Sequence, residues 1–136
     1  MAIARWIVDK SVVARMADPT IDAQLEELAG SLFVCPMGEL EQLFSARSAD
    51  EYDHLKEGVR ERFGVVDAPG DILDRTLALQ RDLAHHHGMW HRTAIPDLII
   101  AETALHHALG VLHVDRDYER IAEVRPLTVR RLGRDR

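Results

Sequence analysis

The 136-residue sequence contains little of what marks a secreted or membrane-bound protein. Its single cysteine, Cys35, cannot form a disulfide within the chain, which favours a reducing compartment. No apolar run approaches the ~20 residues that a membrane-spanning helix needs. Asp9 interrupts the first apolar segment too early for a signal peptide. These absences predict a cytoplasmic protein without a membrane segment.

Positive charge is also scarce. The chain has 17 Lys and Arg against 23 Asp and Glu, which gives a net charge of −6. This acidity excludes a protein that coats nucleic acid without specificity, because such binding needs many cationic side chains. It does not exclude a small acidic site that holds a metal ion. Residues 125–136 carry a balance of +4 and residues 1–124 a balance of −10. We expect this basic C-terminal strand or tail to be solvated and frayed, with a weak phosphate-steering arm as the functional alternative.

The composition and the pattern of apolar residues predict one globular domain over residues 1–136. Hydrophobic residues make up 46% and charged residues 29%, and no repeat or linker is visible. Strands are predicted at 3–9, 31–36, 65–68, 111–114 and 127–131. Helices are predicted at 11–17, 22–29, 38–47, 49–63, 71–86, 96–109 and 118–124. Alternating strands and helices predict a parallel sheet with helices on both faces, an α/β sandwich.

Local signals predict some helix ends and one buried helix face. Ser48 resembles a helix N-cap, and Gly110 is expected to end the helix that precedes the fourth strand. In the segment 38–47, three apolar side chains at helical spacing are expected to pack into the core: Leu40, Leu43 and Phe44.

Acidic residues recur where a parallel sheet places its chemistry. Asp9 and Asp115 each close a predicted strand, beyond whose carboxyl end such sites lie. Glu41 follows the second strand, Asp97 opens a helix, and Asp117 lies two residues beyond Asp115. Any one of them could cap a helix or lie on a solvated face. Several acids at one sheet edge would repel each other unless cations neutralised them, and hard oxygen ligands suit Mg²⁺ or Mn²⁺. The set predicts metal-assisted hydrolysis of a phosphodiester.

The order of these acidic blocks resembles a PIN domain, and more narrowly the VapC-type toxins of bacterial toxin–antitoxin pairs. The resemblance runs over nearly the whole chain, through Asp9-Lys10-Ser11, Glu41 with Leu43 and Ser45, IPDLIIAETAL and HVDRDYERIA. It implies a PIN-like three-layer sandwich, with a parallel sheet of about five strands flanked by helices. It also implies an endoribonuclease that depends on Mg²⁺ or Mn²⁺, a homodimer, and a small cognate antitoxin of VapB type.

The same resemblance implies which residues act. The four acids that bind metal and take part in catalysis would be Asp9, Glu41, Asp97 and Asp115. Asp117 would be an accessory acid, and Ser11 would hydrogen-bond within the site. Our hypothesis is that one or two metal ions activate a water for in-line attack on an RNA phosphate.

Glu39 competes with Glu41 for the second acidic position. The two diverge by about 200° on a helix, and both flank the apolar face of segment 38–47, so periodicity does not choose between them. The family pattern of Glu followed four residues later by a small residue favours Glu41, with Ser45 at the later position. Glu39 stays as an accessory alternative.

Three other interpretations compete with a nuclease. His87 and His91, within the cluster 85–91, could bind a transition metal if they were helical, although Gly88 between them favours a polar loop. A catalytically weak acidic binding module could instead engage a basic partner segment, and metal-dependent thermal stabilisation would distinguish the two. A phosphoacceptor receiver-type domain would need a late lysine, but the lysines are Lys10 and Lys56.

Overall fold

A computed structural model of the chain describes residues 5–114 and 116–133. Within these residues a five-stranded parallel sheet has the order β3-β2-β1-β4-β5. The strands are β1 (Trp6–Val8), β2 (Leu32–Val34), β3 (Gly64–Val65), β4 (Gly110–His113) and β5 (Val129–Arg131). In the central register, Ile7 lies opposite Phe33 of β2 and Val111 of β4. The predicted α/β sandwich around a parallel sheet is confirmed.

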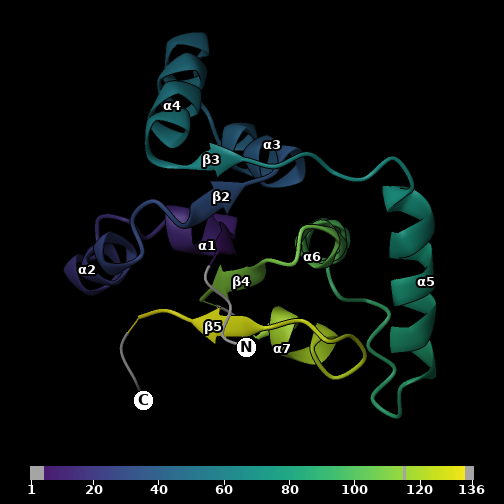
Figure 1. Ribbon diagram of the computed structural model, residues 1–136. Coiled ribbons are helices and arrows are strands. Elements are labelled where there is room, and N and C mark those ends of the chain that lie inside the picture. Colours follow the sequence, from purple (N-terminus) through teal and green to yellow (C-terminus); the bar gives the residue numbers. More distant parts are fainter. Residues whose placement is uncertain (1–4, 115, 134–136) are drawn as a thin grey trace.

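Helices cover both faces of this sheet. They are α1 (Lys10–Val13), α2 (Pro19–Glu27), α3 (Pro36–Phe44), α4 (Ala49–Arg62), α5 (Ile72–His85), α6 (Ile95–His106) and α7 (Asp117–Ile121). Figure 1 shows α1 and α2 on one side of the sheet, α5 and α6 on the other, and α4 projecting beyond β3. None of the helices in the described part of the chain is both long and apolar enough to cross a membrane.

Two hydrophobic cores, one on each face, follow from the alternation of side chains along the strands. Ile7 and Val111 point to one face and pack with buried residues of α5, α6 and α7. Trp6, Val8 and Leu112 point to the other face and pack with buried residues of α1, α2 and α4. The carboxyl ends of the central strands are therefore enclosed by helices from both layers.

One predicted helix boundary is confirmed and another is wrong. The Ser48 hydroxyl caps α4 by accepting a hydrogen bond from the Glu51 backbone N–H at 3.0 Å. Gly110 does not end a helix, because α6 ends at His106 and Gly110 begins β4. A Cβ at Gly110 would lie 2.6 Å from the Trp6 ring, so close strand packing requires glycine there.

The buried face predicted for α3 is wrong for two of its three residues. Leu43 is buried, but Leu40 is 60% exposed and Phe44 is 92% exposed. The buried residues of this helix are instead Gly38, Glu39 and Leu43. Helical period identifies side chains that share a face, but it does not tell whether another element covers that face.

The frayed end predicted for residues 125–136 is wrong for the part that the structure describes. β5 pairs with β4 at the edge of the sheet, and Leu127 and Leu132 are buried. Arg125 donates a hydrogen bond to Asp82 at 2.7 Å, and its Nε lies 3.3 Å from the buried carboxylate of Glu102. These contacts anchor the segment to α5 and α6. Residues 134–136 lie outside the described residues.

Candidate metal centre

Asp9 is placed by the end of the central strand. It follows β1 directly, and its backbone N–H donates to the Leu112 carbonyl at 3.0 Å. It is also the N-cap of α1, where its Oδ2 accepts a hydrogen bond from the Ser11 backbone N–H at 3.0 Å. The residue is only 1% exposed. Asp9 is therefore a buried carboxylate whose direction is set by the strand-to-helix turn.

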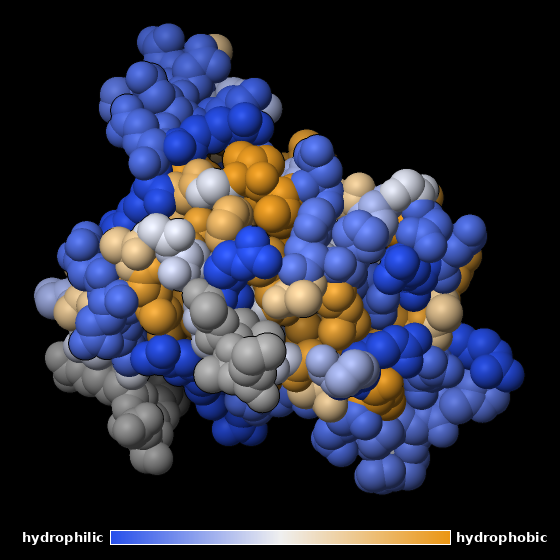
Figure 2. Space-filling model, viewed as in Figure 1, coloured by the Kyte–Doolittle hydropathy of each residue, from blue (hydrophilic) through white to orange (hydrophobic). Residues whose placement is uncertain are grey.

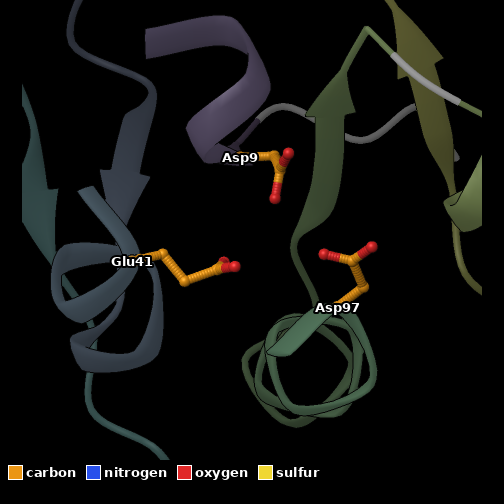
Figure 3. Close-up of side chains that lie close together, drawn as sticks. All are labelled: Asp9, Glu41 and Asp97. Carbon is orange, nitrogen blue, oxygen red and sulfur yellow. The ribbon is translucent and has the colours of Figure 1, made fainter. Parts of the chain in front are cut away.

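Asp97 lies in the first turn of α6, at the third helical residue. The N-cap of this helix is Ala94, so capping does not explain an acid at position 97. The positive end of the helix dipole favours a carboxylate in this turn. Asp97 is 5% exposed. Its side chain points from α6 toward Asp9 at the end of β1 (Figure 3).

Glu41 completes a group of three acids from three different elements. One carboxylate oxygen from each of Asp9, Glu41 and Asp97 lies within 4.8 Å of the others. Figure 3 shows the three side chains pointing toward one another from the end of β1, from α3 and from α6. We call these residues the acidic cluster. Within the described residues, no other group of three His, Cys, Asp or Glu side chains comes this close.

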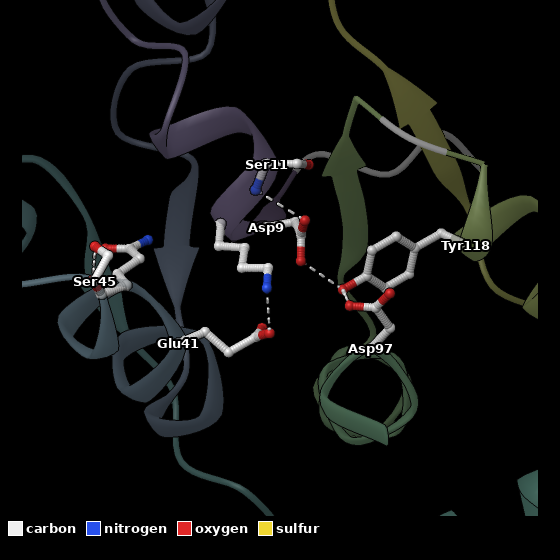
Figure 4. Close-up of polar contacts among 8 residues, drawn as sticks. Asp9, Ser11, Glu41, Ser45, Asp97 and Tyr118 are labelled. Atoms are coloured by element: carbon white, nitrogen blue, oxygen red, sulfur yellow. Dashed lines mark hydrogen bonds and ion pairs between the residues drawn. The ribbon is translucent and has the colours of Figure 1, made fainter. Parts of the chain in front are cut away.

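Tyr118 joins two members of the acidic cluster. Its hydroxyl donates to Asp9 Oδ1 at 2.7 Å and lies 3.4 Å from Asp97 Oδ1 (Figure 4). The side chain is fully buried, and this burial, with the charges of Asp9 and Asp97, raises its pKa well above the ordinary value. The phenol therefore stays a proton donor at neutral pH. Tyr118 was not among the predicted site residues, although it directly follows Asp117 in the block HVDRDYERIA.

Lys10 brings a positive charge to the acidic cluster. Its Nζ lies 2.9 Å from Glu41 Oε2. The hydrogen bond to Glu41 raises the pKa of Lys10, burial lowers it in part, and the charges of Glu41, Asp97 and Asp9 add to the increase. The ammonium thus lies within the electrostatic field of all three acids.

The remaining predicted residues take different places. The Ser11 hydroxyl accepts a hydrogen bond from the Val114 backbone N–H at 3.2 Å, which links α1 to the end of β4. Asp117 is the first residue of α7 and does not belong to the acidic cluster. Asp115, predicted as the fourth acid, lies outside the described residues.

The structure separates Glu39 from Glu41. The Glu39 carboxylate accepts two hydrogen bonds from Arg60 of α4, at 3.1 and 3.0 Å, and is not part of the acidic cluster. Glu41 points into the cluster from the same helix. Ser45, whose position favoured Glu41, donates its hydroxyl to the Gln42 carbonyl at 2.7 Å and so closes the end of α3.

The donor set of the acidic cluster fits a hard divalent cation. Carboxylate oxygens are the ligands that such cations prefer. Glu41 Oε1 is buried and, within the described residues, accepts no hydrogen bond. A buried carboxylate oxygen without a partner is costly in free energy, and a coordinated cation would remove that cost. The acidic cluster is therefore a possible divalent-metal site.

The histidine cluster offers no comparable site. α5 ends at His85, so His87 and His91 do not share the helical spacing that a paired ligand site would need. His86 stacks on Trp90 with ring centroids 4.2 Å apart, and Arg120 lies 5.5 Å from the centroid of the Trp90 ring. Among the described residues, none of these histidines belongs to a group of three close potential metal ligands.

Comparisons with known proteins agree with this fold. The family model of the PIN domain matches residues 6–124. Ribonuclease VapC17 from Mycobacterium tuberculosis is 56% identical over 124 residues, covering 89% of this chain and 90% of that protein. Ribonuclease VapC21 from the same species is 36% identical and covers 88% of both chains.

Solved structures show the same architecture at low sequence identity. The VapBC2 complex from Rickettsia felis, bound to a DNA fragment from its promoter, contains a chain that aligns with a TM-score of 0.75 at 13% identity, over 94% of this chain and 98% of that one. The DNA-bound VapBC complex from Salmonella typhimurium gives a TM-score of 0.76 at 16% identity, over 93% and 97% of the two chains. By its match to the family model and its identity to the VapC ribonucleases, this chain belongs to the PIN domain family, in its VapC group.

Proposed function

We propose that this protein is an endoribonuclease dependent on Mg²⁺ or Mn²⁺, and the toxin of a toxin–antitoxin pair. The observation that carries the proposal is the acidic cluster, in which carboxylate oxygens from the end of β1, from α3 and from α6 lie within 4.8 Å of one another. The 56% identity to a ribonuclease supports RNA as the substrate.

Each residue of the site has a role in this proposal. Asp9, Glu41 and Asp97 hold the cation. A divalent cation bound there lowers the pKa of a water and stabilises negative charge on the phosphate. Tyr118 and the Ser11 amide fix the direction of the Asp9 carboxylate. The resemblance adds Asp115 as a fourth acid, outside the described residues, and Asp117 as an accessory acid.

A cavity of about 970 Å³ beside Glu41 is the proposed entry for RNA. Lys10 and Ser11 line it at the acidic cluster, and Arg15 and Arg62 line it further away. These cationic groups suit a phosphate backbone, which binds chiefly through Lys and Arg. The cavity therefore presents three cations to a phosphate backbone, alongside the acids Glu26, Glu41 and Glu61, although the net charge of the chain is −6.

The same cavity suits a protein partner. Its apolar lining includes Val13, Met16, Phe44, Leu55 and Val59. Helix α4, which borders the cavity, is mostly polar on the face that Figure 2 shows. The structural relatives above are complexes of VapB with VapC. We propose that a small antitoxin of VapB type covers this surface and blocks access to the acidic cluster.

Two further expectations stay proposals. A homodimer would show a mass of twice 15.4 kDa in light scattering, whereas a monomer would show 15.4 kDa. We propose that the protein acts in the cytoplasm, because its proposed substrate is RNA. Fluorescence of a tagged toxin in its host would show where the protein is located.

The decisive experiment is RNA cleavage by the purified chain with Mg²⁺, with Mn²⁺ and with EDTA. Wild type is expected to cleave with either metal, and Asp97→Asn is expected to lose cleavage. Asp53→Asn, on the exposed surface of α4, is the matched control and is expected to cleave like wild type. Equal cleavage by wild type and Asp97→Asn would refute the proposal. Tight binding of an Arg-rich antitoxin segment without any cleavage would support the acidic binding module instead.

A further inference from the structure

Lys10 is the one cation whose nitrogen is shown in contact with the acidic cluster in the described part of the chain. It is the first residue of α1, next to Asp9 in sequence, and its Nζ lies 2.9 Å from Glu41 Oε2. The Glu41 side chain is only 9% exposed, whereas that of Lys10 is 52% exposed. A buried carboxylate is joined to an ammonium that still reaches solvent.

The two oxygens of Glu41 differ in what they contact. Oε2 accepts a hydrogen bond from the Lys10 ammonium, whereas Oε1 is buried without a hydrogen-bond partner among the described residues. A buried carboxylate needs a counter-charge. The Lys10 ammonium contacts only one of the two carboxylate oxygens of Glu41. A divalent cation between the three acids would compete for the same carboxylate.

Asp9 and Lys10 differ in their freedom to change partners. Asp9 is held by the Ser11 amide on one oxygen and by the Tyr118 hydroxyl on the other. Lys10 has a flexible four-carbon stem and lines the cavity beside Glu41, so its ammonium can move into solvent without disturbing the core. The contact between Lys10 and Glu41 is thus the one that can exchange most easily.

We propose that Lys10 is the internal counter-ion of the acidic cluster, which competes with the divalent cation for Glu41 and is displaced into the cavity when that cation binds. Lys10 is then a positioning residue that lowers metal affinity and keeps Glu41 directed into the site. This inference rests on the proposed function, since it requires a metal at the acidic cluster.

Amine labelling of the full-length chain tests the displacement directly. The chain has only two lysines, and Lys56, on the exposed surface of α4, is an internal reference. Acetylation followed by peptide mass spectrometry gives the labelling rate of Lys10 relative to Lys56, with EDTA and with saturating Mn²⁺. We expect Mn²⁺ to raise this ratio about fivefold, which corresponds to the upper range of about 1 kcal/mol for a half-exposed ion pair. A ratio that Mn²⁺ leaves unchanged would overturn the inference.

Mn²⁺ titration followed by electron paramagnetic resonance gives a second measurement. Lys10→Met is expected to bind Mn²⁺ about fivefold more tightly than wild type, by the same ion-pair magnitude. Lys10→Arg keeps the cation and is expected to restore weaker binding, and Lys56→Met is expected to match wild type. If wild type binds Mn²⁺ and Asp97→Asn does not, but Lys10→Met binds like wild type, the inference fails and the proposed function stands. If wild type binds no Mn²⁺, both fail.

Discussion

The hydroxyl of Tyr118 offers a sharp test of how the site is supported. Tyr118→Phe removes one oxygen and keeps the ring, which is buried in the same hydrophobic core as residues of β4 and α6. The lost hydrogen bond spans 2.7 Å and ends on Asp9, a carboxylate that is 1% exposed. A hydrogen bond to a charged group contributes about 1.5–3 kcal/mol. We expect the variant to lose about 2 kcal/mol in its free energy of unfolding.

The same substitution is expected to weaken metal binding. Without the hydroxyl, Asp9 keeps the Ser11 amide but loses the partner that fixes its Oδ1. Loss of a group that orients a metal ligand commonly lowers metal affinity about 10- to 100-fold. We therefore expect Tyr118→Phe to bind Mn²⁺ at least about tenfold more weakly than wild type.

Urea unfolding in EDTA and Mn²⁺ titration are the assays, and the chain supplies its own control. Its only other tyrosine is Tyr52, which is 39% exposed on α4. Tyr52→Phe is expected to change the unfolding free energy by no more than about 0.5 kcal/mol and to leave Mn²⁺ affinity unchanged. Equal stability and equal Mn²⁺ affinity of Tyr118→Phe and wild type would refute the reasoning.

Three further predictions concern the neighbouring elements. Glu41→Gln is expected to weaken Mn²⁺ binding strongly, as calorimetry can measure. Glu39→Gln loosens the contact with Arg60 and is expected to bind Mn²⁺ like wild type. Arg125→Met leaves the buried Glu102 without its cation and is expected to cost about 3 kcal/mol at pH 7 in urea unfolding. Burial raises the pKa of Glu102 above 4.5, so the stability that its protonated form contributes is present below 4.5 and is lost as pH rises through the raised pKa. Arg125 offsets that loss only while Glu102 is ionised, so the deficit of Arg125→Met is expected to shrink as pH falls from 7 toward 4.5. Leu43→Ala is expected to lower the free energy of unfolding by about 2–4 kcal/mol. Phe44→Ser, at a side chain 92% exposed, is expected to lower it by at most about 0.5 kcal/mol and to weaken antitoxin binding.

The main features of the fold could be predicted from the sequence because they are local or periodic. Apolar runs such as that of β1 identify buried strands, and the alternation with helices requires parallel pairing. The position of Asp9 at a strand end placed it at the correct edge of the sheet, and Asp97 came from the start of a helix. The proximity of these two carboxylates follows from the topology.

The rest depends on contacts between distant segments. Tyr118 is 109 residues from Asp9, and no spacing rule connects them. The ion pair between Arg125 and Glu102 likewise requires the C-terminal segment to return to α6, so the strand at 127–131 was predicted but its anchoring to the helices was not. The family pattern favoured Glu41 over Glu39, but the physical reason, the contact of Glu39 with Arg60 of α4, joins residues 21 positions apart.

The most direct test of the account is the location of a bound metal in crystals grown with Mn²⁺, by its anomalous scattering. We expect a peak among the carboxylates of Asp9, Glu41 and Asp97, at about 2 Å from their oxygens, with the Lys10 ammonium no longer on Glu41. The Asp97→Asn variant is expected to lose the peak. A wild-type crystal at saturating Mn²⁺ with no peak at these three residues would contradict the account.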